Sequence, residues 1–263
     1  MAVFSNKPPL HRSWDELRRQ EAQFIQKNVV QAPSPLEQTL DRFVPDQLQT
    51  TLETAFRKAF ELVFTNGAAV LSAISGTQKR LAAAQPALEA ARRSPTRHNL
   101  NVLTRRAGRS KTLNLLFSGV EGVSTGLFGV GIPDIPLFLA VALKTVYEIA
   151  ASYGFSSSSD QEKCLILRII QISLSRGQEL CDGNRALDQM LAAPETLLHD
   201  LNTQLRITSN ALAHELLFWK FLQGTAVVGV AGGLSDVACL RRISAYAGLK
   251  YRRRFLLTLG NEV

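Results

Sequence analysis

Two aspartates stand beside glycine-rich apolar stretches, in positions where a carboxylate could act in catalysis or bind a metal. Asp134 lies between Pro133 and Pro136, and Asp236 follows Ser235. The same positions suit the N-cap of a helix, where a side-chain oxygen accepts hydrogen bonds from backbone N–H groups of the first turn. Because capping accounts for both residues without chemistry, we favour it over a catalytic or metal-binding role.

A group of polar residues follows Asp134 along the chain. Lys144 and Glu148 are four residues apart, which puts them on one face of a helix. Asp134 precedes Lys144 by about 15 Å of helix rise, so a single helix cannot bring all three into one site. A hydrolytic site would need residues from another helix, and a structural cluster that steadies a crowded core is the interpretation we favour. The candidates for this polar cluster are Asp134, Lys144, Glu148, Tyr153, Glu162 and Arg168.

Other motifs give little support to metal, nucleotide or nucleophilic chemistry. His214-Glu215 begins like the zinc motif HExxH, but Phe218 stands where the second histidine would be. The glycine run at 126–131 lacks the Lys-Ser/Thr of a phosphate-binding loop. The three cysteines form no CxxC pair, which is typical of buried thiols in a reducing compartment. We therefore expect no metal and no cofactor, and we favour a non-enzymatic protein.

The charge distribution is more informative about function. The formal net charge is +8, yet residues 77–111 alone hold nine basic residues and one acid, and residues 241–254 hold six basic residues and no acid. Such blocks can bind anionic lipid or nucleic-acid phosphate, or form an ordinary solvated helix face. We favour lipid, because the blocks adjoin the glycine-rich apolar stretches and hold few aromatic side chains for base stacking. The membrane-binding candidates are Arg105, Arg106, Arg109, Arg241, Arg242, Lys250, Arg252, Arg253 and Arg254.

Helical periodicity recurs along the chain, and strand patterns are scarce. Two stripes of small residues stand out, namely Gly119, Gly122, Gly126 and Gly129, and then Ala226, Gly229 and Gly233. Each stripe falls on one face of a helix, where a smooth backbone lets another helix pack closely. A Gly-rich break and a longer helix follow each stripe. We therefore expect two small-residue helical hairpins packed on each other at the centre of the fold.

Neither glycine-rich stretch is a simple membrane span. A span needs about 20 mostly apolar residues, and Asp134 interrupts residues 122–143 just as Asp236 interrupts residues 221–240. Buried core helices are the interpretation we favour, and wedges that enter a bilayer part-way are the alternative. The N-terminus holds no apolar run of signal-peptide length, which predicts a protein that stays in the cytoplasm.

Two segments of the chain resemble the EcsC family. They are GLFGVGIPDIPLFLAVALKTVYEIAASYGF at 126–155 and GVAGGLSDVACLRRISAYAGLKYRRRFL at 229–256. The shared pattern falls on Asp134, Pro136, Lys144, Glu148, Tyr153 and Gly154, and on a closing Tyr-x-x-Arg at Tyr251 and Arg254. The sequence departs from this pattern at Ser235-Asp236, where an Asn would be expected. The resemblance implies a mostly helical bacterial protein that works at or near a membrane, in the service of an ABC transporter or another envelope process; some members carry a hydrolase label.

Together these patterns predict an all-α bundle of about eight to ten helices without significant sheet. We expect an N-terminal helical extension over residues 1–45, an EcsC-like helical domain over 46–257 and a tail over 258–263. The function we favour is that of a cytoplasmic peripheral membrane protein that binds an anionic membrane surface and a membrane protein complex, and no nucleic acid. Two alternatives stay open: a hydrolase built on the polar cluster, and an effector that inserts its glycine-rich hairpins into a bilayer.

Overall fold

The computed structural model describes residues 7–29, 46–66, 68–108, 135–156, 159–193, 200–225 and 232–260, and within these ranges it contains helices and no strand. The predicted all-α fold is confirmed. The helices are α1 (Pro9–Val29), α3 (Asp46–Asn66), α4 (Ala68–Arg93), α5 (Arg97–Ala107), α8 (Ile135–Ser152), α9 (Asp160–Leu174), α10 (Gly177–Ala192), α11 (Leu201–Thr225) and α12 (Gly232–Leu257).

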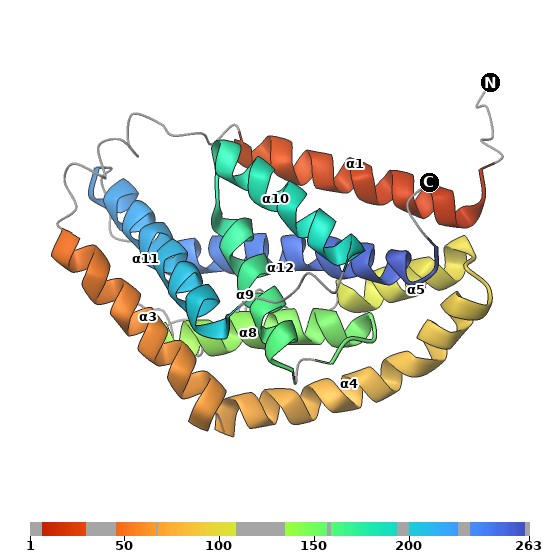
Figure 1. Ribbon diagram of the computed structural model, residues 1–263, viewed down its shortest axis with the longest axis horizontal. Coiled ribbons are helices and arrows are strands. Elements are labelled where there is room, and N and C mark those ends of the chain that lie inside the picture. The colour runs from red at the N-terminus through yellow and green to blue at the C-terminus, as the bar shows by residue number, and fades with distance from the viewer. Residues whose placement is uncertain are drawn as a thin grey trace.

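Helices α8, α9 and α12 lie at the centre of the bundle (Figure 1). Helix α12 packs against both α8 and α9, and ten of the 15 residues of α9 are buried. Helix α8 buries Leu139, Ala142 and Leu143 almost completely. A helix that is apolar on most of its circumference must be covered on most sides by other helices, which explains the central place of α8 and α9.

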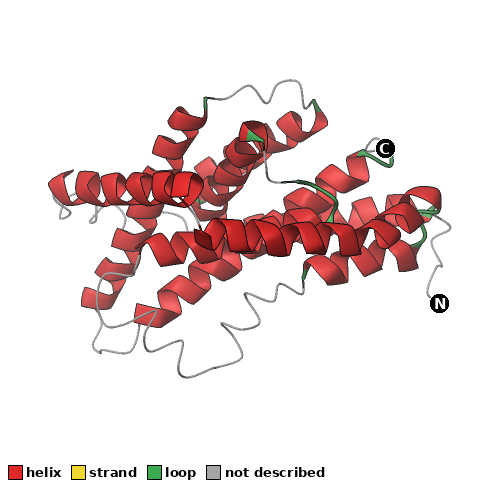
Figure 2. Cartoon of the chain, turned by 90° about the horizontal axis from the view of Figure 1, so that it is seen from below, coloured by secondary structure: helices red, strands yellow, loops and turns green. Residues whose placement is uncertain are grey.

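The remaining helices surround this centre. Helix α4 runs along α8, α11 packs against α3 and α9, and α1 and α10 pack on α12 (Figure 1). Seen from below, the helices overlie one another in more than one layer (Figure 2). The bundle therefore presents α4 and α5 at its surface on one side and α1 on another.

Two helix ends have the hydrogen bonds and backbone angles that their local sequence favours. Ser159 caps α9, since its side chain accepts a hydrogen bond from the backbone N–H of Glu162 at 3.2 Å. Gly154 follows α8 with a φ of +88°, in the left-handed region that favours glycine. A Cβ at this position would also lie 2.8 Å from Cδ1 of Leu88, so that side chain would have to shift as well.

A proline inside a helix removes one backbone hydrogen bond and usually breaks or kinks the helix, but α4 continues through Pro86. In the turn before this proline, Arg106 Nη1 donates to the Ala83 carbonyl at 2.6 Å. The predicted N-cap at Asp236 is wrong. Helix α12 begins at Gly232, so Asp236 lies inside the helix and not at its N-cap. Each glycine disfavours a helix by only about 1 kcal/mol, which the packing of a long helix outweighs.

Most of the predicted small-residue hairpins lie outside the described residues. This holds for Gly119, Gly122, Gly126, Gly129 and Gly229, and Gly233 is in the first turn of α12. The described end of the first apolar stretch belongs to the hydrophobic core, where Ile135, Phe138 and Leu139 are buried. For that part, the expected core helix is confirmed.

Candidate functional site

Helices α4 and α5 form a hairpin whose exposed surface is cationic. In residues 77–108 the acid is Glu89, which is exposed and lies 3.7 Å from Arg93. Six basic side chains are exposed here, so this surface carries a net charge of +5. We call it the cationic hairpin face, and its basic residues are Lys79, Arg92, Arg93, Arg97, Arg105 and Arg106. Of the predicted membrane-binding residues, Arg105 and Arg106 are exposed, and Arg109 lies outside the described residues.

Local hydrogen bonds fix the turn between the two helices of the hairpin. The Thr96 side chain caps α5 by accepting from the Asn99 backbone N–H at 3.3 Å. Asn99 Nδ2 in turn donates to the carbonyls of Ala90 at 3.2 Å and Ser94 at 2.8 Å. These bonds join the end of α4 to the start of α5, so the arginines on both helices are held in a defined arrangement.

Arg80 joins the hairpin to the core. Its Nη1 lies 3.0 Å from Glu148 Oε2, and its Nε donates to the Ser152 hydroxyl at 3.1 Å, both on α8. Its Nη2 donates to the Arg106 carbonyl at 3.0 Å at the end of α5. Arg80 is therefore not part of the exposed cationic surface, because it is half-buried and connects α4, α5 and α8.

The second basic block, at 241–254, does not form the exposed cationic surface that the sequence predicted. Lys250, Arg252 and Arg253 are only 1%, 5% and 7% exposed. Lys250 Nζ lies 3.0 Å from Glu21 Oε1 and 2.5 Å from Asp188 Oδ1. Arg253 contacts the same two carboxylates at 2.5 and 3.1 Å. We call Glu21, Asp188, Lys250 and Arg253 the ionic quartet; it joins α1, α10 and α12.

The other members of this block also have partners inside the protein. Arg252 Nη2 lies 3.2 Å from Glu16 Oε2 on α1. Arg254 Nη1 lies 2.6 Å from Glu162 Oε2 on α9. Arg242 is half-buried and donates to the Ser175 carbonyl, whereas Arg241 is exposed. Folding therefore uses most of the block to attach α12 to its neighbours.

Burial and neighbouring charges shift the pKa values of the two carboxylates in the quartet in opposite directions. Burial opposes the ionisation of Glu21, but hydrogen bonds and charges from Arg253 and Lys250 outweigh it and hold the pKa of Glu21 below its usual value. Burial dominates at Asp188 and raises its pKa, with a further contribution from the charge of Glu21. The quartet contains two acids and two bases, so it is close to neutral while Asp188 is ionised.

The described members of the candidate polar cluster differ in their burial and in their partners. Lys144 is exposed on α8, whereas Glu148 is buried and paired with Arg80. Tyr153 is buried, which raises the pKa of its hydroxyl group. Arg168 is half-buried, and burial lowers its pKa. Asp134 lies outside the described residues.

Glu162, the remaining member of the candidate cluster, binds two side chains of α12. Its Oε1 accepts from the Tyr251 hydroxyl at 2.7 Å, and its Oε2 accepts from Arg254 Nη1 at 2.6 Å. Burial and the negative charge of Glu162 raise the pKa of Tyr251, which keeps this hydroxyl protonated as a donor. Glu162 thus connects α9 to α12, and the contact is of a structural kind.

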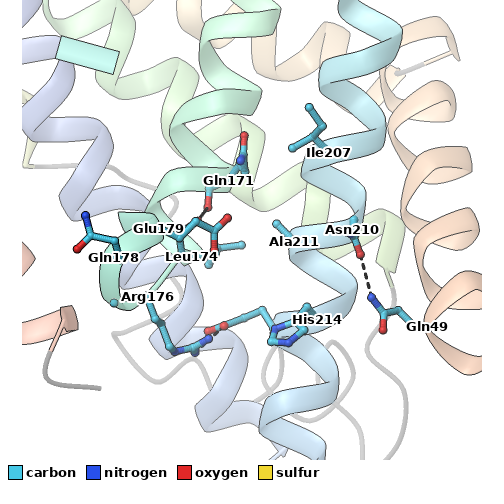
Figure 3. A pocket seen from close by; sticks show the side chains of 13 residues that line it. Gln49, Gln171, Leu174, Arg176, Gln178, Glu179, Ile207, Asn210, Ala211 and His214 are labelled. Atoms are coloured by element: carbon cyan, nitrogen blue, oxygen red, sulfur yellow. Dashed lines mark hydrogen bonds and ion pairs between the residues drawn. The ribbon is translucent and has the colours of Figure 1, made fainter. Parts of the chain in front are cut away.

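A polar cleft of about 500 Å³ lies between α9, α10 and α11, with the start of α3 at its edge. Gln49 Nε2 donates to Asn210 Oδ1 at 3.1 Å across one side of this cleft (Figure 3). On another side Arg176 Nη2 lies 2.6 Å from Glu215 Oε2, and both side chains are over nine-tenths buried. Side-chain amides supply hydrogen-bond donors and acceptors here, and Arg176 and Glu215 neutralise each other.

The described residues provide neither a metal site nor a membrane span. No group of three or more His, Cys, Asp and Glu side chains comes together in these ranges to hold a metal ion. Among the same residues, no helix combines the length and the apolar character that crossing a bilayer requires.

Comparison with known proteins settles the family. The sequence profile of the EcsC protein family matches residues 11–256. The chain belongs to the EcsC protein family. Protein EcsC of Bacillus subtilis (strain 168) is 26% identical to it over 148 residues, which are 55% of this chain and 60% of that protein. The alignment thus spans less than two thirds of this relative. No solved structure matches the chain.

The EcsC match begins at residue 11. It therefore includes α1, which contacts α12 through Glu16 and Glu21. Sequence reasoning missed both acids, because nothing local in α1 distinguishes them from exposed carboxylates. The closing Tyr-x-x-Arg of the EcsC pattern was found, and the structure gives it a physical role: Tyr251 and Arg254 share Glu162.

Proposed function

We propose that this EcsC protein is a non-enzymatic peripheral membrane protein whose cationic hairpin face binds anionic lipid headgroups. In this role it lies on the cytoplasmic surface of a membrane and serves a membrane protein complex, an ABC transporter or another envelope assembly. The observation that carries the proposal is the set of six exposed basic side chains on the face, with Glu89 as the acid among them.

The charge of the face is large enough for reversible lipid binding. A basic residue near an anionic bilayer contributes about 1 kcal/mol. A net charge of +5 therefore supports attachment that is strong at low salt and weakens as salt shortens the range of the attraction. Because hydrogen bonds fix the turn at Thr96 and Asn99, binding does not have to pay for ordering the hairpin.

The composition of the face favours lipid over nucleic acid. Residues 77–108 contain no Phe, Tyr or Trp, so the hairpin offers no aromatic ring on which a base could stack. The chain also continues from this hairpin into the glycine-rich apolar stretch that starts near residue 112. A basic surface next to an apolar segment is typical of proteins that bind at the membrane interface.

The hydrolase alternative receives less support from the described residues. Glu148 and Glu162, the buried carboxylates among the candidates, each bind an arginine on a neighbouring helix, and Lys144 faces solvent. A general acid or base needs access to a substrate proton, and these contacts leave the carboxylates engaged in packing. The separation of these side chains supports a non-enzymatic role.

Co-sedimentation with vesicles tests the proposal. The test variant changes Arg92, Arg97 and Arg105 to Glu on the cationic hairpin face. Loss of three cations at about 1 kcal/mol each predicts at least about 100-fold weaker binding to phosphatidylglycerol vesicles, and neutral phosphatidylcholine vesicles should bind neither protein. The matched control makes the same charge change at Arg57, Lys58 and Arg206, which are exposed on α3 and α11.

Three outcomes would contradict the proposal. Equal binding to anionic and neutral vesicles would exclude headgroup charge as the basis of attachment. An equal loss in the test and control variants would show that net charge, and not the hairpin face, decides binding. Release of a dye trapped in the vesicles would favour the alternative of an effector that inserts into the bilayer.

A further inference from the structure

We propose that α1 is a detachable cover over a second lipid-binding surface, formed by Lys250, Arg252 and Arg253 of α12. The proposal rests on the proposed function, because it assigns the same class of ligand, an anionic phospholipid headgroup, to a second surface. In the described structure that surface is closed, with α1 lying along α12 (Figure 1).

The acids of α1 occupy the positions that phosphate groups would take. Glu21 contacts Lys250 and Arg253, and Glu16 contacts Arg252. When α1 leaves, Asp188 is the carboxylate that remains among the contacts described. Three cations and one carboxylate then give a local charge of +2. Phosphate oxygens accept hydrogen bonds from guanidinium and ammonium groups as carboxylates do, so an anionic headgroup can replace Glu16 and Glu21.

The apolar side of α1 suits a membrane interface as well as it suits α12. Trp14 and Leu17 are 2% and 0% exposed in the docked state, and Phe24 packs against Tyr246 of α12 with 5.1 Å between ring centroids. The opposite side of the helix exposes Arg12, Arg18, Arg19 and Lys27. A helix with Trp, Leu and Phe on one side and basic residues on the other is typical of helices that lie in a bilayer interface.

One edge of the interface between α1 and its neighbours is open to solvent. A surface depression of about 510 Å³ lies there, lined mostly by α10, including Asp188, with Ile25 of α1 and Arg253 of α12. The Asp188 side chain is accordingly 21% exposed. Solvent therefore reaches the edge of the quartet, and the same opening gives a headgroup a route to Arg253 before α1 has moved.

Most groups at this interface exchange one partner for another of the same kind. The apolar residues Trp14, Leu17 and Phe24 pass from one apolar environment to another, and the cations of α12 pass from carboxylate to phosphate partners. Glu16 and Glu21 lose their cationic partners, so headgroup binding has to exceed that loss. Helix α1 therefore leaves α12 only where anionic lipid binds the open form more tightly than the closed form.

Fluorescence of Trp14 reports the position of α1. The chain has two tryptophans, so Trp219→Phe leaves Trp14 as the reporter in the full-length protein. With phosphatidylglycerol vesicles that carry brominated acyl chains, we expect loss of Trp14 fluorescence on binding, and no loss with brominated phosphatidylcholine vesicles. Far-UV circular dichroism checks that the reporter protein keeps its helices.

Substitution of Glu21 tests whether its carboxylate holds α1 on α12. Glu21→Gln removes the carboxylate shared by Lys250 and Arg253, and should raise the vesicle partition coefficient at least about tenfold over the control. The control is Asp15→Asn, which makes the same charge change on the same helix, at an exposed residue that pairs with Lys7. Amide hydrogen exchange without lipid should show faster exchange in α1 for Glu21→Gln alone.

The results separate this proposal from the proposed function. If anionic vesicles bind the protein but bromine leaves Trp14 fluorescence unchanged, α1 stays docked and the cover is refuted, while lipid binding by the hairpin stands. Equal partition coefficients for the Gln and Asn variants also refute the cover. If anionic vesicles fail to bind the protein at all, both proposals are wrong. If Glu21→Gln loses its helical circular dichroism signal, the Trp14 fluorescence of the Trp219→Phe protein decides whether α1 leaves α12.

Discussion

Replacing Lys250 by methionine measures what the ionic quartet contributes to stability. The Lys250 side chain has no exposed surface, and its ammonium lies 3.0 Å from Glu21 and 2.5 Å from Asp188. Methionine keeps most of the apolar stem, so the change removes mainly the charge. Removing one partner of a buried ion pair costs about 3–5 kcal/mol. Because Arg253 still faces both carboxylates, we expect a loss near the lower limit, about 3 kcal/mol.

Urea unfolding followed by circular dichroism checks this value. The slope of the unfolding free energy against urea concentration should be the same in both proteins, which shows that the unfolded state is unchanged. The control is Arg185→Met, since Arg185 and Asp182 form an exposed pair with side chains 70% and 56% accessible. An exposed pair contributes at most about 1 kcal/mol. Adding Asp188→Asn to Lys250→Met should restore part of the loss, because it removes the carboxylate left without its nearest cation. A Lys250→Met protein as stable as the control would refute the reasoning.

Four further substitutions test individual positions. Gly154→Ala should lower the free energy of unfolding by at least about 1–2 kcal/mol because of its positive φ, whereas Gly248→Ala in α12, where an added Cβ meets nothing within 4 Å, should raise it by about 0.5–1 kcal/mol; thermal unfolding compares the two. Tyr251→Phe removes a hydrogen bond to the Glu162 carboxylate and should cost about 1.5–3 kcal/mol in urea unfolding, and a cost within experimental error would contradict this assignment. The pKa of Glu21 is held below its ordinary 4.5, so its contribution to stability is complete above that pH and is lost as the pH falls through the lowered pKa. The difference in unfolding free energy between wild type and Glu21→Gln should therefore shrink between about pH 6 and about pH 3.5. A constant difference would show that Glu21 does not titrate in this range.

Local signals in the sequence were sufficient for the features that depend on a few neighbouring residues. The cap at Ser159 and the left-handed glycine at Gly154 are set by side-chain and backbone chemistry within one turn. Local rules favour a helix end near Pro86, yet α4 continues there, beside a hydrogen bond from Arg106 of another helix that no local signal announces. The predicted N-cap at Asp236 was wrong for a similar reason, since tertiary packing extends α12 beyond its local stop signals.

The partners of the basic block on α12 could not be predicted, because they are 60 to more than 230 residues away in sequence. One signal was available. Consecutive helical residues point in directions about 100° apart, so Arg252, Arg253 and Arg254 cover most of the circumference of α12. Three such residues cannot share one outer surface, and at least one must point inward and need an acid. Which acids these are depends on the assembled fold.

Arg80 gives the hairpin a mechanical property. Arg80 binds Glu148 and Ser152 of α8 and the last turn of α5 at the same time. These contacts fix α4 and α5 to the core as one rigid unit. When a rigid pair of helices binds a membrane, it fixes the orientation of the whole bundle relative to the bilayer. Helix α5 lies at one end of the longest axis and α11 at the other (Figure 1). A molecule attached to lipid by the turn between α4 and α5 would therefore hold the α9–α11 cleft in a fixed orientation relative to the headgroups.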